Sequence, residues 1–380
     1  MDGLETPPEN TIAGKLPGSA IDDRLSSLPD EILSQILSFL PTKYAVGTAV
    51  LSRRWTDLWT RVSNLDFDNK LAYKQLDICW IRDSPTQLAN RVSRDFEFSR
   101  FVDRVLSQHR NLNAVRRFRL HFEVFRRNWR LRPNFVRTRE SVFGSLVEEI
   151  DVSLVGAMEF GSPARIWWLP ESFYTLKNLK AVKLDHVMMG ADGPVSLPSL
   201  KILQLRQVVI EDFEMLSKLI SGCPALESLD LHDCLIEYGN ENDILAASLP
   251  SLRNFKIYVD IGGELCDIEI EAPNLEHVVL LCFADVKFLG SSPLPCLHSA
   301  RVDTGESRTI SIHCLMGLLT QISNAKEMSL DWPTLVINIS PSSLKYTFFI
   351  THRCSADLLT LVFRNLCWVW MMFSCLFSPI

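Results

Sequence analysis

Apolar residues recur at helical spacing in the stretch SSLPDEILSQILSFLP, residues 26–41, but they cover an unusually broad face. On a helical wheel they fill about half of the circumference, whereas a helix packed on a single core needs an apolar stripe of about 100°. These residues are Leu28, Ile32, Leu33, Ile36, Leu37, Phe39 and Leu40. Either a large core surrounds this helix, or a partner protein covers part of it.

Two further short helices are predicted directly after the first one. Pro41 ends the first helix, and Thr42 can cap a second helix in KYAVGTAV. A third helix is predicted in LSRRWTDLW, residues 51–59, where leucine and tryptophan side chains share one face. Three helices this short have little interior between them, so they cannot bury the broad face of the first helix completely. The small interior therefore favours an external protein partner, whereas the apolar stripe taken alone favours an ordinary core helix.

The rest of the chain repeats the pattern L-x-x-L-x-L, which is typical of leucine-rich repeats. Each copy predicts a short strand whose apolar side chains point inward. Because one repeat cannot bury that face alone, neighbouring repeats are expected to stack into a curved solenoid. The copies are VRRFRL (115–120), VEEIDV (147–152), LKAVKL (179–184), LKILQL (200–205), LESLDL (226–231), LRNFKI (252–257), LEHVVL (275–280), LHSARV (297–302) and AKEMSL (325–330).

The predicted fold class is α/β, with a three-helix unit at the N-terminus followed by a solenoid of short parallel strands. Residues 91–110 show a helical apolar pattern and are expected to join the two parts. The predicted segments are a disordered tail at 1–21, the three-helix unit at 22–68, a helical linker at 69–110, the repeats at 111–340 and a divergent hydrophobic tail at 341–380.

The helical unit resembles the F-box of the plant F-box/leucine-rich-repeat/FBD family. The resemblance rests on LP at 28–29, LPTK at 40–43, VLSRRW at 50–55 and Trp59. The segments FVDRVLSQH, WLPESFYTLKNLKAVKLDHV and LISGCPALESLDL are similar to the same family, so the resemblance spans roughly residues 22–335. The FBD region that normally follows in this family is not found here.

This resemblance implies a non-catalytic substrate receptor of a Skp1–cullin–F-box ubiquitin ligase. The polar N-terminal residues without a signal peptide and the cysteines without a pairing pattern predict the nucleus or the cytoplasm as its location. The F-box would bind a Skp1-type adaptor, and through it cullin, while the repeats would bind an unknown target protein. Trp55 can belong to the core instead of the adaptor contact. The residues expected to contact the adaptor are Leu28, Pro29, Ile32, Leu33, Ile36, Leu37, Leu40, Pro41 and Trp55.

Alternation along the repeat strands predicts which side chains face outward, toward a target on the concave surface. We expect a polar protein partner with an apolar contact at Val279 and Leu281. His232 lies near Asp230, but both occupy outward strand positions, so a solvated pair is favoured over an acid–base couple. The outward residues are Lys183, Asp185, Gln204, Arg206, Asp230, His232, Lys256, Tyr258, Val279, Leu281, Arg301 and Asp303.

Composition and charge narrow the chemistry further. No HExxH, GxSxG, GxGxxG or Walker A pattern occurs, and the ten cysteines form no CxxC pair, so neither an enzyme nor a metal site is predicted. The net charge is −6, yet residues 81–140 hold fifteen arginines, no lysine and six acids. A face that is solvated or binds an acidic partner is favoured there over a nucleic-acid site. A resemblance to plant hormone-receptor F-box solenoids also implies an inositol polyphosphate as a candidate cofactor.

The last forty residues depart from the repeat pattern. They end in a 23-residue apolar stretch, LLTLVFRNLCWVWMMFSCLFSPI, with Arg364 as its one charge. This stretch is long enough for a membrane anchor, and it can also cap the last repeat. We favour a third interpretation, an alternative transcript or a mispredicted gene model. The alternatives to a substrate receptor are therefore a membrane-tethered repeat scaffold and a truncated decoy that binds the adaptor but delivers no substrate.

Overall fold

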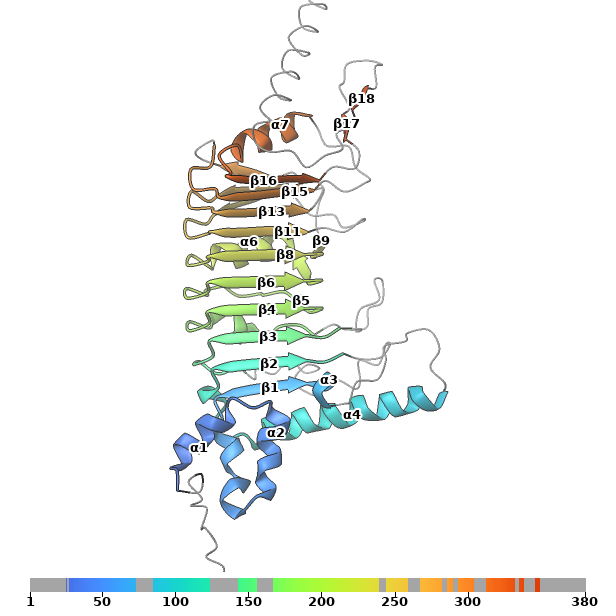
Figure 1. Ribbon diagram of the computed structural model, residues 1–380, viewed down its shortest axis with the longest axis vertical. Helices are drawn as coiled ribbons and strands as arrows, with labels where there is room; N and C mark the ends of the chain where they lie inside the picture. The colour runs from blue at the N-terminus through green and yellow to red at the C-terminus, as the bar shows by residue number, and fades with distance from the viewer. Residues whose placement is uncertain are drawn as a thin grey trace, which may run out of the picture.

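One long parallel sheet runs through the chain, in the order β1-β2-β3-β4-β6-β8-β11-β13-β15-β16 (Figure 1). The computed structural model describes residues 25, 27–72, 85–123, 143–155, 167–238, 244–258, 267–281, 286–289, 293–303, 312–331, 335–337 and 346–348. The strands of the long sheet are β1 Asn64–Asp68, β2 Arg117–His121, β3 Glu149–Ser153, β4 Ala181–Asp185, β6 Ile202–Arg206, β8 Ser228–His232, β11 Asn254–Tyr258, β13 His277–Leu281, β15 Ser299–Asp303 and β16 Glu327–Asp331.

Each of the nine sequence repeats places a strand at the same position of its pattern, and all pairs share one register. Leu65 of β1, for example, lies opposite Phe118 of β2, which lies opposite Ile150 of β3. In the strands of the long sheet from β1 to β15, the second and fourth residues are apolar and buried, because the pleat points them to the same face. The prediction of stacked parallel strands is therefore confirmed.

The first strand of the sheet was not predicted, because β1 lies inside the segment assigned to the three-helix unit. Its residues follow the repeat pattern with Val62, Leu65 and Phe67, all 1% exposed. β1 pairs in parallel with β2 over five residues, although a long insertion separates the two strands in the sequence. The sheet thus begins at residue 64, ahead of the predicted boundary at 68.

The N-terminal unit contains two α-helices and three 3₁₀ helices packed below β1 (Figure 1). The structure has no continuous helix over 51–59, where a third helix was predicted. Two short 3₁₀ helices, η2 and η3, lie there instead. Proline precedes both α-helices, where its fixed φ and missing N–H are tolerated. The elements are α1 Asp30–Leu37, α2 Thr42–Gly47, η1 Thr48–Val50, η2 Arg53–Thr56 and η3 Leu58–Arg61.

A long helix, α4 Pro85–Gln108, crosses the base of the sheet after the short helix α3 Asn69–Ala72 (Figure 1). It is longer than the helix predicted over 91–110, and it ends two residues earlier. Phe98 of α4 stacks on Phe122 at 5.2 Å between ring centroids, and Phe101 contacts Phe67 of β1 at 6.2 Å. The 3₁₀ helix η4 Leu112–Ala114 then leads into β2. α4 therefore closes the lower end of the apolar core.

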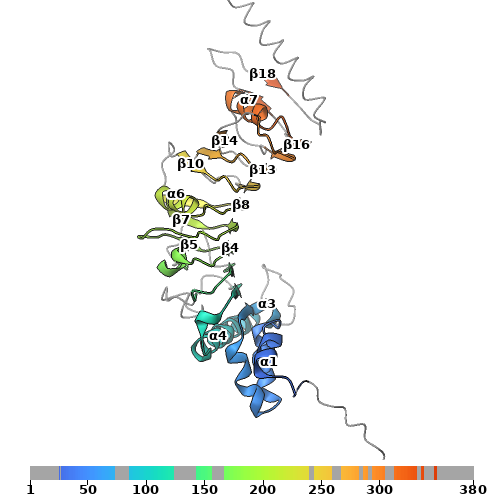
Figure 2. The ribbon, with the colours of Figure 1, turned by 90° about the vertical axis from the view of Figure 1, so that its left-hand side faces the viewer.

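Shorter elements form the back of the stack, opposite the long sheet (Figure 2). Two three-stranded parallel sheets, β5-β7-β9 and β10-β12-β14, lie here, and α6 is capped by the Asp212 carboxylate, which accepts from Met215 N at 2.7 Å. β17 and β18 form an antiparallel pair. The elements at the back are η6 Glu171–Thr175, β5 Met188–Met189, β7 Val209–Asp212, α6 Phe213–Ser221, β9 Leu235–Tyr238, β10 Ile244–Ser248, β12 Asp267–Glu271 and β14 Val286–Leu289. The C-terminal end of the stack carries α7 Ile312–Gln321, β17 Leu335–Ile337 and β18 Tyr346–Phe348 (Figure 1).

Candidate functional site

Large apolar side chains exposed to solvent are concentrated on the N-terminal helices. In the described part of the chain eleven such residues are exposed, and eight of them lie between positions 25 and 51. A concentration of this kind marks a protein-binding surface, because soluble proteins otherwise scatter their exposed apolar residues. We call this set the apolar surface: Leu25, Ile32, Ile36, Phe39, Leu40, Tyr44, Val50 and Leu51.

Helix α1 divides its broad apolar face between the core and the apolar surface. Leu33 and Leu37 are 0% and 2% exposed, while Ile32 and Ile36 are 42% and 40% exposed. The core of the small helical unit therefore takes one half of the face and leaves the other half open. This division matches the sequence argument that two short helices cannot cover the whole face.

The residues expected to contact an adaptor fall into three groups by burial. Pro29, Ile32, Ile36 and Leu40 lie at the surface, and Leu28 and Pro41 are half-buried. The other three, Leu33, Leu37 and Trp55, lie in the interior, where they support the apolar surface from below. Residues that the sequence argument did not select are among the most exposed: Phe39 at 79%, Tyr44 at 53%, Val50 at 88% and Leu51 at 63%.

Polar contacts fix the start of α1 against the rest of the helical unit. Arg54 Nε donates to Asp30 Oδ1 at 2.9 Å, and Arg54 Nη2 donates to the carbonyl oxygen of Leu28. Arg61 lies 3.8 Å from the second carboxylate oxygen of Asp30. Asp30 also lies in the first turn of α1, where a negative charge is favourable. These contacts hold Leu28 and Pro29 at the edge of the apolar surface.

The second candidate site is the outward face of the long sheet. All twelve residues selected for target binding occupy its outward strand positions, as the alternation predicted. Lys183, Arg206, Lys256 and Arg301 are exposed, and the other eight are half-buried. The rings of His232 and Tyr258 stack at 4.3 Å between centroids with an interplanar angle of 24°. Their role in target binding stays a prediction.

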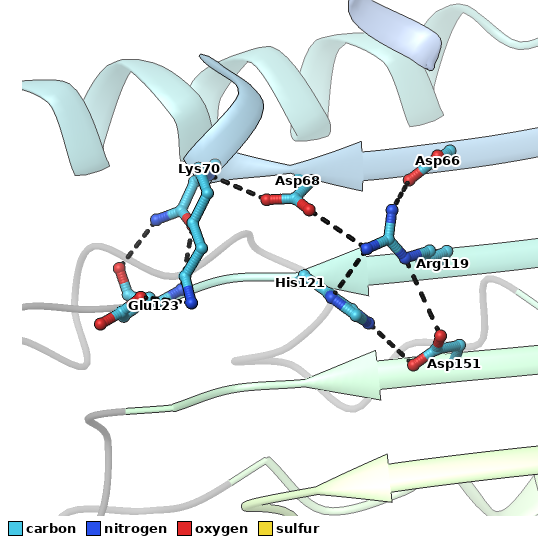
Figure 3. A network of polar contacts seen from close by, with 8 residues as sticks. Asp66, Asp68, Lys70, Arg119, His121, Glu123 and Asp151 are labelled. Carbon is cyan, nitrogen blue, oxygen red and sulfur yellow. Dashed lines mark hydrogen bonds and ion pairs between the residues drawn. The ribbon is translucent and has the colours of Figure 1, made fainter. Parts of the chain in front are cut away.

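On the first three strands, this face carries a network of hydrogen bonds and ion pairs (Figure 3). Arg119 on β2 donates to Asp66 at 2.9 Å and to Asp68 at 3.1 Å, both on β1. It also donates to His121 Nδ1 at 3.0 Å, and His121 Nε2 lies 2.8 Å from Asp151 on β3. One arginine and one histidine therefore join the strand that follows the helical unit to the first two repeats.

The arginine-rich segment is engaged in ion pairs wherever its contacts are described between residues 110 and 123. Arg110 binds Asp57 at 2.8 Å, Arg116 lies 3.6 Å from Glu148, and Arg117 binds Glu149 at 2.6 Å. These arginines therefore meet carboxylates of neighbouring elements. Six of the fifteen arginines lie between 124 and 140, outside the described residues, so the inositol polyphosphate site stays a prediction.

Other features of the described residues add no reactive centre. No group of three metal-ligating side chains occurs among them, and none of their helices is both long and apolar enough to cross a bilayer. Burial raises the pKa of both Cys223 and Cys234 to about 12, so these thiols are unreactive at neutral pH. The apolar stretch at 358–380 lies outside the described residues, and its three interpretations stay open.

Comparison with known proteins identifies both parts of the chain. A model described as "F-box domain" matches residues 25–67, and one described as "FBD-associated F-box protein At5g56370, LRR repeats" matches residues 147–290. The region between residues 147 and 290 contains six of the nine sequence repeats.

Three proteins of Arabidopsis thaliana illustrate the similarity. The F-box/LRR-repeat protein At5g41840 is 34% identical over 241 residues, which are 61% of this chain and 41% of the relative. The F-box/LRR-repeat protein At4g00320 is 33% identical over 265 residues, 69% of this chain and 48% of the relative. The F-box/FBD/LRR-repeat protein At4g00160 is 28% identical over 342 residues, 85% of this chain and 63% of the relative. The chain thus spans about half the length of the first two relatives.

Proposed function

An F-box followed by FBD-associated leucine-rich repeats makes the chain a homologue of the plant F-box/FBD/LRR-repeat proteins, and on this premise we propose that it is a non-catalytic substrate receptor of a Skp1–cullin–F-box ubiquitin ligase. The F-box binds a Skp1-type adaptor, and the repeats bind a target protein. The receptor contributes proximity, because it holds the target beside the ubiquitin-charged enzyme of the complex.

The observation that carries this proposal is the apolar surface. Eight exposed apolar residues lie within one small helical unit, and α1 presents Ile32 and Ile36 on the side away from its own core. Burial of large apolar side chains contributes about 1.5–3 kcal/mol each, so a partner that covers several of them gains substantial binding energy. In this proposal the target meets the outward face of the long sheet, on the concave side of a curved solenoid.

A pull-down of the full chain with a plant Skp1-type adaptor tests the proposal. The informative variant is Ile36→Asp with Phe39→Asp, which introduces two charges into the apolar surface. The matched control is Leu146→Asp with Ile202→Asp, because these residues are also apolar and exposed, at 49% and 38%, but lie outside the F-box. We expect adaptor binding by the wild type and the control, and a loss of about 100-fold or more in the F-box variant.

A second variant tests the start of α1. Replacing Leu28 and Pro29 by alanine should also weaken adaptor binding. Leu28 packs partly against the core, so the thermal unfolding of this double variant must be compared with that of the wild type. Adaptor binding that is unchanged in both F-box variants, or absent in a folded wild type, would refute the proposal.

A further inference from the structure

The outward face of the long sheet divides into two parts that differ in how their charges are paired. On β1, β2 and β3, Arg119 is bound by three carboxylates of neighbouring strands. On the six strands from β4 to β15, every exposed lysine, arginine, aspartate or glutamate at an outward position is a lysine or an arginine. None of these forms an ion pair with a described residue: Lys183, Arg206, Lys256 and Arg301.

The acidic side chains on these six strands are less exposed to solvent than the basic side chains. Asp185, Asp230 and Asp303 are half-buried in the outward rows. Asp185 is already engaged, since it lies 2.6 Å from His186 Nδ1 and accepts from Ser153 Oγ at 3.0 Å. Asp230 is opposite Lys256 in the register of β8 and β11, but the two form no ion pair. A partner that approaches this face therefore meets the basic groups first.

The network at Arg119 shows how this row binds carboxylates. Arg119 occupies the third position of its strand, the same row as Lys183, Lys256 and Arg301. It is 35% exposed and still holds Asp66 at 2.9 Å and Asp151 at 3.8 Å. The row geometry is therefore compatible with charge-assisted contacts. From β4 to β15, no carboxylate of the described residues makes such a contact with Lys183, Lys256 or Arg301, so these basic groups are available to carboxylates of a partner.

An apolar position with a shallow hollow lies between two of the basic groups. Val279 of β13 is opposite Lys256 of β11 on one side and Arg301 of β15 on the other. A hollow of about 250 Å³ opens beside it, across β13, β15 and β16. The outward side chains at the hollow are Val279, Ser299, Arg301, Glu327 and Ser329. This volume accommodates one apolar side chain of a peptide.

We propose that the face from β4 to β15 binds an extended acidic segment of the target, with one apolar side chain placed at Val279 between acids that pair with Lys256 and Arg301. The inference rests on the proposed function and specifies its target. Adjacent strands lie about 4.8 Å apart, so Lys183 and Lys256 are about 14 Å apart and Lys256 and Arg301 about 10 Å. An extended peptide spans these distances in about four and about three residues.

The probe for this inference is a fluorescein-labelled peptide of nine glutamates and one central leucine, titrated with the full chain and followed by fluorescence anisotropy. The test variant is Lys183→Glu, Lys256→Glu and Arg301→Glu. The control variant, Lys177→Glu, Lys218→Glu and Lys326→Glu, changes the net charge equally at positions outside the outward rows. We expect the Kd to rise about tenfold or more in the test variant and about twofold or less in the control.

Two further measurements test the apolar contact. Replacing the central leucine of the peptide by glutamate should raise the Kd about threefold to tenfold, because a leucine contact is lost. Val279→Asn in the protein, which introduces no charge, should have a similar effect on the leucine peptide and little effect on the all-glutamate peptide. Equal binding of both peptides to the wild type would overturn the assigned place of the apolar side chain.

Two outcomes overturn the inference as a whole: equal loss of peptide binding in both charge variants, or single-stranded DNA that binds as tightly as the peptide and depends on the same three residues. The adaptor pull-down separates this result from the proposed function. Adaptor binding without peptide binding refutes only the acidic segment, whereas peptide binding without adaptor binding refutes the ligase role.

Discussion

The Nε2 atom of His109 donates a hydrogen bond to the carbonyl oxygen of Val62 at 2.9 Å, and both residues are buried. Val62 follows η3 within the F-box, and His109 follows the last residue of α4. A carbonyl oxygen can only accept, so Nε2 carries the proton of the neutral ring. The other nitrogen, Nδ1, is buried without a hydrogen-bond partner in the described structure. A protonated ring would leave its second N–H unpaired at this position.

Acid is therefore expected to weaken the junction between the F-box and α4. Burial lowers the pKa of His109 from its ordinary value of 6.5, although the hydrogen bond to Val62 acts in the opposite direction. The unfolded chain then binds the proton at a higher pH than the folded chain does. The contribution of His109 to the free energy of unfolding is thus complete above about pH 6.5 and declines as the pH falls toward the folded pKa.

His109→Gln is the variant that isolates this effect, because glutamine keeps an N–H for Val62 but does not titrate. Urea denaturation of both proteins between about pH 5 and pH 8 measures it. We expect the stability of the wild type relative to the variant to decrease on acidification. A difference that stays constant over this range would contradict the prediction.

Truncation on the buried side of α1 is expected to reduce stability, whereas truncation on its exposed side is expected to reduce adaptor binding. Leu33→Ala removes a fully buried side chain and should destabilise the protein by about 2–5 kcal/mol. Ile36→Ala removes a side chain that is 40% exposed and should change stability by about 0.5 kcal/mol or less, while it weakens adaptor binding. Denaturation and adaptor binding measured on both variants test this contrast, and the assignment of the two sides fails if Ile36→Ala is as destabilising as Leu33→Ala.

Gly144 is required for close packing before β3. A Cβ at this position would lie 2.3 Å from Asn113 Cα and 2.6 Å from the carbonyl oxygen of Leu112. Because both atoms belong to the backbone, the loop that carries η4 would have to move. Gly144→Ala should therefore destabilise the protein by about 1–3 kcal/mol. Gly47→Ala is the control, since a Cβ there meets no atom within 4 Å; α2 should tolerate it or become more stable.

Arg119 is expected to stabilise the first three strands through its charge and its geometry together. Its removal in Arg119→Met leaves Asp66, Asp68 and Asp151 close to one another without a cation. We expect a loss of about 1–3 kcal/mol in urea denaturation, and Arg119→Lys should restore only part of it, because an ammonium group lacks the planar fork of donors. The loss should shrink at high salt, where repulsion among the carboxylates is screened. A fully stable Arg119→Met variant would show that the network contributes nothing.

The repeat region was predictable because its signal is local. Each L-x-x-L-x-L copy specifies two inward positions, and Leu229 and Leu231 of β8 are 1% and 2% exposed as that pattern requires. β1 follows the same rule with Val62, Leu65 and Phe67. It was missed because the next copy begins only after α4, so no regular spacing pointed to it.

The division of the apolar surface could not be predicted from the sequence. Leu33 and Ile32 are adjacent apolar residues on one broad helical face, and which of them is buried depends on where Leu58 and Trp59 pack. Likewise, Val50 and Leu51 continue an apolar pattern but are exposed, because η1 and η2 are too short to fold them back onto the core. Periodicity gives the width of an apolar face and leaves open how much of it the rest of the protein covers.

The position of β1 gives the proposed receptor a fixed length scale. Only two residues separate η3 from β1, and β1 is itself the first rung of the sheet, so the F-box is joined to the repeats without a flexible hinge at this point. From β1 to β16 the stack advances by nine strand spacings, or about 43 Å. A target bound to one repeat would thus lie about 5 Å further from the adaptor than a target bound to the preceding repeat. In the proposed ligase, the repeat that binds a target would decide which of the target's lysines come within reach of ubiquitin.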